Sequence, residues 1–161
     1  MADIWGKAKR SEVMSLIRSR GNKETELHLL AILRRHRITG WRRGQKLLGK
    51  PDFLFPRERV AIFVDGCFWH GCPRCYRRPS SNRGYWDAKF QRNRTRDREV
   101  TRELKKLGWT VVRIWQHTLR TEAATVSRIK SSLKPRSVKS LLSVLNRTCS
   151  VSSYRSTSAR A

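Results

Sequence analysis

The segment from residue 60 to residue 75 constrains the fold more than any other part of the chain. A run of apolar residues, 60–64, ends at Asp65 and is followed by a short loop with three cysteines, two aromatic residues and a histidine. Five consecutive apolar residues between polar flanks are typical of a buried strand. The loop therefore places candidate metal ligands and a candidate acid or base at the end of a strand.

The cysteines of this loop have a metal-binding spacing. Cys67, Cys72 and Cys75 form a Cys-x4-Cys-x2-Cys pattern, and structural zinc sites need four tetrahedral ligands. His117 is the best candidate for the fourth ligand. It follows the apolar run 111–115, which would bring the two strand ends together if it paired with 60–64. Free thiols in the loop, or His70 as a competing ligand, are the alternatives.

The charge of the chain indicates its partner. Lys and Arg number 37 against 12 Asp and Glu, a formal net charge of +25 on 161 residues. Such an imbalance favours a polyanion as partner, above all nucleic acid. The start of the chain has no apolar leader and we find no apolar run long enough to span a membrane, so we expect no membrane partner and an intracellular, cytoplasmic location.

The length allows one domain. We expect it to span residues 1–130, followed by a basic, Ser-rich tail at 131–161 that contains no acid and is predicted to be disordered. A short helix is expected at 138–145 within this tail. The remaining cysteine, Cys149, is expected to be a free thiol.

Helical patterns dominate both ends of the expected domain. Ser11 is a candidate cap for a short helix with apolar residues at 13–17, and Asn22 for a second helix with Glu24 and Glu26 in its first turn. A long helix is predicted at 86–107, ended by Gly108.

The sequence also predicts three strands. The segments 52–55 and 60–64 are expected to form a hairpin around the turn 56–59, and 109–115 a third strand. The predicted fold class is α/β, with a mixed sheet flanked by helices.

Two acids precede or end predicted strands. An acid beside a DNA surface weakens binding, so Asp52 and Asp65 need a reason to be there. Magnesium would supply it, since this ion prefers carboxylates together with phosphate oxygens. Pairing with surface arginines is the alternative for each acid.

A basic stretch lies at the start of the long predicted helix and inside it. We expect this stretch to contact phosphates, and the neighbouring Trp86 favours DNA. A solvated face is the alternative. The arginines concerned are Arg83, Arg92, Arg94 and Arg96, with Arg98 beyond them.

Several motifs in order along the chain resemble the very short patch repair (Vsr) DNA mismatch endonuclease family. The resemblance extends from about residue 1 to residue 119 and leaves only the tail uncovered. The motifs are Pro51-Asp52-Phe53, the segment 63–72, Tyr85-Trp86, Asn93, Arg96-Asp97, Leu107-Gly108-Trp109 and Ile114-Trp115.

The resemblance implies a restriction-endonuclease-like fold of the PD-(D/E)xK type with a structural zinc. It also implies magnesium-dependent nicking of duplex DNA beside the thymine of a T:G mismatch produced by deamination of 5-methylcytosine. Mismatch-repair proteins are implied as partners, and we expect a monomer associated with the nucleoid.

The resemblance also implies roles for individual residues. Asp52 would hold magnesium together with the backbone carbonyl of Val64. His70 would act as general base or position the water, with Asp97 as its partner and Glu26 as an acid that approaches the same site.

Aromatic residues of the loop match family residues that insert beside the mismatched pair. Phe68, Trp69 and Trp86 are therefore expected to contact DNA, because aromatic wedges offset the stacking that a wobble pair loses. The alternative is that they are core residues, which a polar loop rich in Gly and Cys does not favour. Met14 would approach the groove from the other side, although a lone methionine on a helix is more often a packing residue.

The sequence departs from the family pattern at the catalytic strand and in the loop. No Glu-x-Lys follows Asp52. The lysine of that pattern therefore has no counterpart here, and His70 must take over its part in the reaction. Asp65 stands where some members carry histidine, which leaves it a base, a second metal ligand or neither. The cysteine-rich zinc ligand set also replaces a histidine-rich one.

Two other functions remain open from the residues. One is a zinc-stabilised basic DNA-binding protein without catalysis, in which the acids are structural. The other is a nuclease of the same fold that acts on another lesion. Loss of magnesium-dependent nicking on replacement of Asp52, with zinc content and DNA affinity retained, would separate catalysis from binding.

Overall fold

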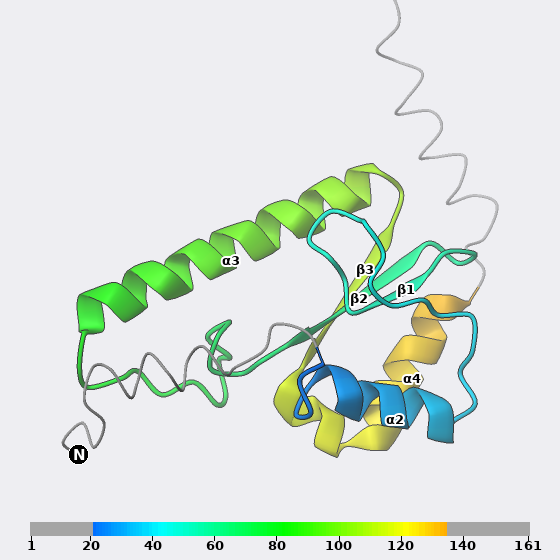
Figure 1. Ribbon diagram of the computed structural model, residues 1–161, viewed down its shortest axis with the longest axis horizontal. Helices are drawn as coiled ribbons and strands as arrows, with labels where there is room; N and C mark the ends of the chain where they lie inside the picture. The colour runs from blue at the N-terminus through cyan, green and yellow to red at the C-terminus, as the bar shows by residue number, and fades with distance from the viewer. Residues whose placement is uncertain (1–20, 135–161) are drawn as a thin grey trace, which may run out of the picture.

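A computed structural model describes residues 21–134 of the chain (Figure 1). Met14, Cys149 and the helices expected at 11–17 and 138–145 lie outside these residues. The elements in chain order are α2 (Glu26–Arg35), β1 (Phe53–Phe55), β2 (Val60–Asp65), α3 (Arg83–Lys106), β3 (Thr110–Trp115), the 3-10 helix η1 (Gln116–Arg120) and α4 (Glu122–Leu133).

The strands form a mixed sheet in the order β1-β2-β3. β1 and β2 pair antiparallel around the turn 56–59, which confirms the predicted hairpin. β2 and β3 pair parallel, with Asp65 opposite Trp115 at their shared end. Because a parallel pair needs a crossover, α3 and the loop before it lie between these strands in the sequence. The pairing brings the loop after β2 next to η1.

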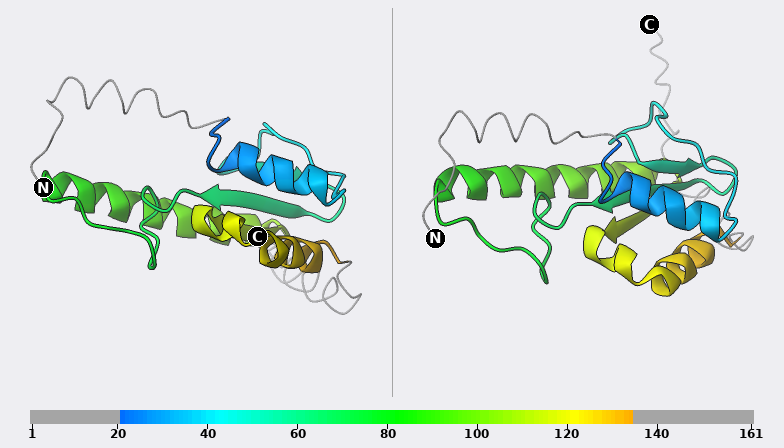
Figure 2. Two further views of the ribbon diagram at one scale, coloured as in Figure 1. Left: turned by 90° about the horizontal axis from the view of Figure 1, so that it is seen from below. Right: turned by 60° about the horizontal axis from the view of Figure 1, so that its bottom comes forward.

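Helices cover both faces of the sheet, as predicted. Figures 1 and 2 show α3 along one side of the sheet, with α2 and α4 on the other. Alternate strand residues form two cores. Phe53, Ile62 and Ile114 pack with α2 and α4. Ala61 and Phe63 pack with α3.

The second predicted helix begins later than its expected cap. Residues 23–25 form a turn, and α2 starts at Glu26. The side chain of Asn22 accepts a hydrogen bond from the Glu24 amide at 2.8 Å, so it caps this turn rather than the helix. Glu24 therefore lies outside the first helical turn, and Glu26 within it.

α3 begins three residues before the predicted start and ends just before Leu107. Three of its predicted apolar residues, Phe90, Val100 and Leu104, are buried. Leu107 follows the helix and is 57% exposed, so its assignment to the apolar face was wrong. Gly108 has φ +79°, a backbone conformation that favours glycine, and it confirms the predicted end of the helix.

α4 continues to Leu133, past the domain boundary expected at residue 130. Ile129 of this helix is fully buried against the core that contains α2. Within residues 21–134, no helix is both long and apolar enough to cross a membrane.

Candidate active site

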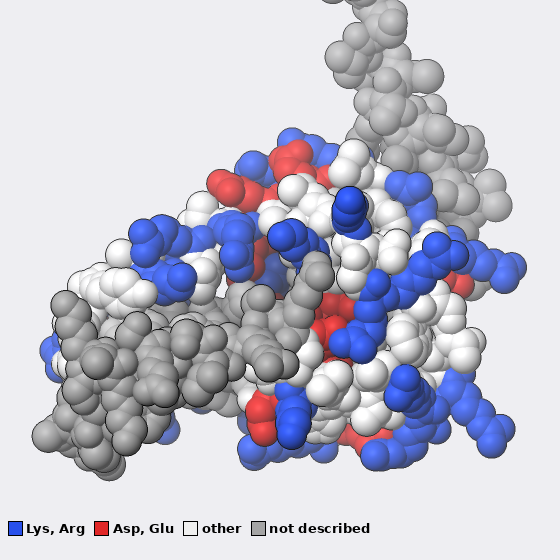
Figure 3. Space-filling view, in the orientation of Figure 1, with Lys and Arg blue, Asp and Glu red and all other residues white. Residues whose placement is uncertain are grey.

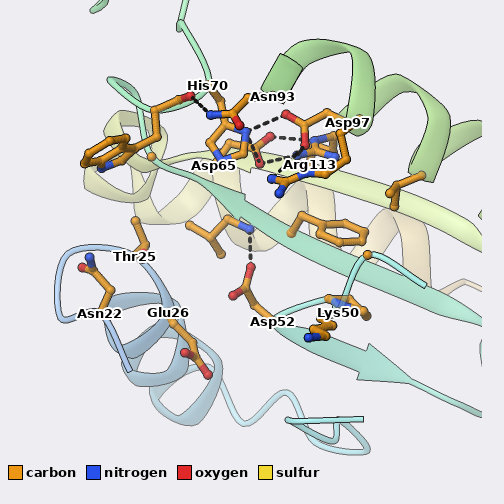
Figure 4. A pocket seen from close by; sticks show the side chains of 18 of the residues that line it. Asn22, Thr25, Glu26, Lys50, Asp52, Asp65, His70, Asn93, Asp97 and Arg113 are labelled. Carbon is orange, nitrogen blue, oxygen red and sulfur yellow. Dashed lines mark hydrogen bonds and ion pairs between the residues drawn. The ribbon is translucent and has the colours of Figure 1, made fainter. Parts of the chain in front are cut away.

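A cleft of about 1000 Å³ lies between α2, α3 and the end of β2 (Figure 4). The five residues predicted to be catalytic all line it, although they come from different elements. They are Glu26 of α2, Asp52 before β1, Asp65 of β2, His70 of the loop after β2 and Asp97 of α3.

Asp52 points at the backbone of β2, between Glu26 and the His70 side of the cleft. Its Oδ2 atom accepts a hydrogen bond of 2.7 Å from the Val64 amide. Burial, with smaller contributions from the charges of Glu26 and Asp65, raises the pKa of Asp52 to about 6. The ionised carboxylate is thus costly without a cation, which fits a metal ligand.

His70 and Asp97 form a hydrogen-bonded pair. His70 Nδ1 lies 2.6 Å from Asp97 Oδ2. Burial by itself raises the pKa of Asp97, but the hydrogen bond to His70 and the charges of His70 and Arg113 outweigh burial and leave this pKa below its ordinary value. With Nδ1 held by the carboxylate, Nε2 is the nitrogen that can take up a proton.

Arg113 of β3 also lines this cleft, and the sequence analysis did not identify it. Its Nε and Nη2 atoms donate to the two carboxylate oxygens of Asp65, at 2.7 and 2.5 Å. Asp65 is only 4% exposed, and His70 Nδ1 lies 3.7 Å from its Oδ1 atom. The one available signal was a charged residue within the apolar run 111–115.

Glu26 is likewise held by an arginine that sequence analysis missed. Its Oε1 atom accepts hydrogen bonds from Nε and Nη2 of Arg43, the first at 2.7 Å. Its Oε2 atom accepts a bond of 2.6 Å from the Gly21 amide. Glu26 is 7% exposed, so this carboxylate lies at the edge of the cleft with both oxygens engaged.

The structure brings together the predicted zinc ligands. Ligand atoms of Cys67, Cys72, Cys75 and His117 all lie within 4.8 Å of one another. His117 Nδ1 is 3.2 Å from the Cys67 sulfur and 3.5 Å from the Cys72 sulfur. His117 reaches the loop because η1 follows β3 directly.

The chemistry of this group fits a soft divalent cation. Burial raises the pKa of Cys67 to about 11, so its thiolate requires a positive charge beside it. A Cys3His set is a common structural zinc site. His70 instead lies with Asp65 and Asp97 in a separate group, so the geometry does not favour it as a competing zinc ligand.

The aromatic residues predicted to contact DNA form a cluster between the loop and α3. Phe68 packs edge-on against Trp69, Trp86 and Phe90, with ring centroids 5.2–5.6 Å apart. Trp86 is 9% exposed and stacks on Phe90, while Phe68 and Trp69 are half-buried. The aromatics predicted to contact DNA thus pack against one another, and Trp69 also lines the cleft.

The arginines predicted to contact phosphates are exposed residues of α3. Arg83, Arg92, Arg94 and Arg96 are all exposed. Arg94 also donates to the Gly71 carbonyl at 3.1 Å, and Arg96 lines the cleft. In Figure 3, basic side chains gather over α3 and around the middle of this face, where acidic side chains are visible between them. The surrounding positive charge would attract a polyanion such as nucleic acid to this face, where the acidic residues of the cleft lie.

Comparison with known proteins identifies the family. Residues 2–77 match the family described as DNA mismatch endonuclease Vsr, and this segment includes the three loop cysteines. The type II nicking enzyme V.NaeI of Lentzea aerocolonigenes is 47% identical over 76 residues, which cover 47% of this chain and 46% of that enzyme. That alignment spans about half of each protein.

Longer alignments connect the chain to two further proteins. The type II nicking enzyme V.XorIIP of Xanthomonas oryzae pv. oryzae is 36% identical over 140 residues, which cover 84% of this chain and 99% of that enzyme. The DNA mismatch endonuclease Vsr of Escherichia coli K12 is 34% identical over 137 residues, 81% of this chain and 86% of that protein. The chain thus belongs to the DNA mismatch endonuclease Vsr family and is an endodeoxyribonuclease.

Proposed function

We propose that the chain is a magnesium-dependent endonuclease that nicks duplex DNA beside the thymine of a T:G mismatch arising from deamination of 5-methylcytosine. The observation that carries this proposal is the meeting of Asp52 with the His70–Asp97 pair in one cleft on a basic face. Membership of the Vsr family supports the endonuclease activity. The T:G mismatch as substrate is inferred from the resemblance to that family.

Two groups of residues suit the two metal ions. Asp52 and the carbonyl of Val64 would hold Mg²⁺, since a buried carboxylate with a raised pKa gains most from a cation. When bound, Mg²⁺ would stabilise negative charge on the phosphate as the bond breaks. Cys67, Cys72, Cys75 and His117 would hold a structural Zn²⁺.

The residues of the cleft can carry out the hydrolysis. His70 accepts a proton at Nε2 from the water that attacks phosphorus, and Asp97 stabilises the imidazolium through Nδ1. The bond between phosphorus and the leaving oxygen then breaks, its electron pair stays on that oxygen, and the oxygen takes up a proton from solvent. Lys50, Lys89 and Arg96 line the same cleft and are suited to hold the phosphates in place.

The duplex would lie along the exposed arginines of α3, with Phe68, Trp69 and Trp86 at the mismatched pair. A T:G wobble pair unstacks at low cost, and the aromatic cluster offers faces on which its neighbours can stack. Met14 would approach the same groove from the other side. Asp65 and Glu26 also line the site, but each is hydrogen-bonded to an arginine. We therefore assign them a structural role beside the reacting groups.

The remaining features of the proposal follow from this function. We assign the mixed sheet, with Asp52 beside its hairpin, to the restriction-endonuclease-like class. We also propose that the protein acts as a monomer. Mismatch-repair proteins would be its partners, and a chromosomal substrate supports a nucleoid-associated, cytoplasmic location.

The test is strand-specific nicking of matched T:A and mismatched T:G duplexes with Mg²⁺, by wild type, Asp52→Asn and His70→Ala. We expect the wild type to nick only the T:G duplex, and both variants to bind it without nicking. Binding without nicking by the wild type on all duplexes would support the non-catalytic alternative. Nicking confined to another lesion would support a different nuclease of this fold.

A further inference from the structure

Arg113 is held by two carboxylates from different elements. It forms a two-point pair with Asp65 at the end of β2, and its Nη2 atom also lies 3.0 Å from Asp97 Oδ1 of α3. Its guanidinium lies over the ring of Phe63, 5.0 Å from the centroid. Contacts on several sides fix the plane of the guanidinium, unlike those of a single exposed ion pair.

The contacts of Asp97 show what this arrangement does. One oxygen, Oδ2, holds His70 Nδ1 at 2.6 Å, and the other, Oδ1, faces Arg113. Both oxygens of the Asp97 carboxylate are therefore held, and rotation of the carboxylate would break the contact with His70 or the contact with Arg113. Arg113 is thus placed to fix the direction in which Asp97 presents Oδ2 to the histidine, and the exposed Arg96 lies farther from the same Oδ1 atom, at 3.9 Å.

The charges give a second reason for the arginine. Asp65 and Asp97 both approach His70, and two carboxylates this close repel each other unless a cation lies between them. The guanidinium supplies that positive charge from the protein itself. It also occupies both oxygens of Asp65, which leaves this residue poorly suited to act as a base or a metal ligand.

We propose that Arg113 is a positioning residue that aligns Asp97 and, through it, His70, and that Asp65 serves as the anchor of Arg113. The catalytic part of this inference rests on the proposed nuclease function, in which His70 accepts the proton. The alternative is a structural ion pair that stabilises the end of the sheet and leaves the histidine unaffected.

The experiment compares Arg113→Met, Arg113→Lys and the control Arg128→Met in the full-length, zinc-loaded protein. Arg128 is an exposed arginine of α4, so its variant controls for the loss of one positive charge. Thermal unfolding and zinc content report folding. Affinity for a T:G duplex and the single-turnover nicking rate at saturating enzyme separate binding from chemistry.

We expect Arg113→Met to bind the duplex within about twofold of wild type but to nick it roughly 10- to 100-fold more slowly, a range typical of misplaced supporting residues. Arg113→Lys should recover part of this rate, and Arg128→Met should nick like wild type. A folded Arg113→Met that nicks within about twofold of wild type would overturn the proposal.

A spectroscopic measurement tests the alignment without relying on nicking. The Nδ1 proton of His70, assigned by its loss in Asp97→Asn, should be visible in the wild type and shifted or lost in Arg113→Met. An unchanged signal would overturn the proposal even if wild type nicks no duplex, whereas absence of nicking with the expected signal change would count against the proposed function alone.

The substitution Arg113→Met leaves the buried Asp65 without its ion-pair partner and could prevent folding. A second variant keeps the proposal testable in that case. The double variant Asp65→Asn/Arg113→Met removes that unpaired charge. If Arg113 aligns Asp97, the folded double variant still nicks slowly. If it regains the wild-type rate, the pair is structural and the proposal is wrong.

Discussion

The carboxyl group of Asp52 lies in a desolvated cleft near Glu26 and Asp65, and its pKa is raised from 3.8 to about 6. The folded protein therefore keeps a proton on Asp52 in the range from about pH 4 to pH 6, where the unfolded chain has lost it. As the pH rises through this range, the folded state loses stability relative to the unfolded state. Above about pH 6 the full cost of the ionised carboxylate is present.

We predict that Asp52→Asn is more stable than wild type at pH 8, by on the order of 1–3 kcal/mol, and that the difference disappears near pH 4. The amide oxygen of the variant can still accept the bond from the Val64 amide. Thermal unfolding of the metal-free proteins across this pH range measures the difference. Mg²⁺ should raise the unfolding temperature of wild type at pH 8 and leave that of Asp52→Asn unchanged.

Asp87→Asn provides the control, because Asp87 is an exposed acid of α3 paired with Arg78. Its removal should change stability little at any of these pH values, as surface pairs contribute little. A variant Asp52→Asn less stable than wild type at pH 8 would show that the carboxylate is stabilised in the metal-free protein.

Single residues were predictable where their chemistry is unusual for their surroundings. Asp52, His70 and the clustered cysteines stand out in a basic chain. In the structure, Asp52 and His70 line one cleft, and the three cysteines lie together with His117. Arg113 and Arg43 do not stand out, because a chain with 37 basic residues offers many arginines. Which arginine meets which acid depends on the packing of distant elements, such as β3 against β2.

At the level of elements, the segment before Asp52 packs closely on α3. Gly49 has φ +75°, and a Cβ atom there would lie 2.3 Å from Val100 Cγ1. Val100 belongs to the core between the sheet and α3. The absence of a side chain at Gly49 therefore permits α3, which carries Asp97, to lie against the loop that leads to Asp52.

We predict that Gly49→Ala destabilises the protein by roughly 1–3 kcal/mol more than Gly44→Ala. Both glycines have positive φ, with Gly44 at +67°, but a Cβ at Gly44 meets no atom within 4 Å. The difference between the variants therefore isolates the contact with Val100 from the backbone strain. Denaturant unfolding measures both, and equal losses of stability would contradict the close contact.

The cysteine loop is the second element whose geometry can be tested. We predict that Cys72→Ser lowers the bound zinc and the unfolding temperature, since a fully buried ligand is lost. Nicking should fall as well, because His70 lies two residues before Cys72.

Cys149→Ser is the matched control, as this cysteine lies outside the Cys-x4-Cys-x2-Cys pattern. Zinc measured by metal analysis should equal that of wild type in this control. Full zinc content in Cys72→Ser would contradict the proposed ligand set.

The elements themselves were largely predictable, because hydrophobic periodicity and the turn and stop residues marked them. Gly108 ended α3, and the apolar runs of β2 and β3 suggested the pairing that brings His117 to the loop. The start of α2 was not predictable, since Asn22 forms an equally good turn. The contact of Phe68 with Phe90 depends on the path of the loop over α3, which no local pattern specifies.

On the scale of the whole molecule, positive charge lies over α3 and around the cleft (Figure 3). DNA affinity should therefore fall steeply with salt, as contacts with phosphates release counterions. Because phosphates are the same in both duplexes, T:G and T:A substrates should show the same dependence of log affinity on log salt concentration. The mismatch should change affinity by a constant factor.

We predict that Arg92→Gln reduces this salt slope by about 0.9, the contribution of one phosphate contact. Arg128→Gln on α4 should leave the slope unchanged, because α4 lies on the other face of the sheet. Titrations at several salt concentrations measure both slopes. Equal slopes for Arg92→Gln and wild type would place the DNA away from this part of α3.

The contact of Cys67 with His117 joins residues that are 50 positions apart in the chain. A metal held by both would close a ring of chain that contains the whole of α3 and β3, with Asp97 and Arg113 inside it. Such a cross-link restricts the unfolded chain in the way a disulfide does. Chelation should thus release the entire ring at once, so that loss of one ion unfolds α3 and the Asp97 side of the cleft in a single cooperative step.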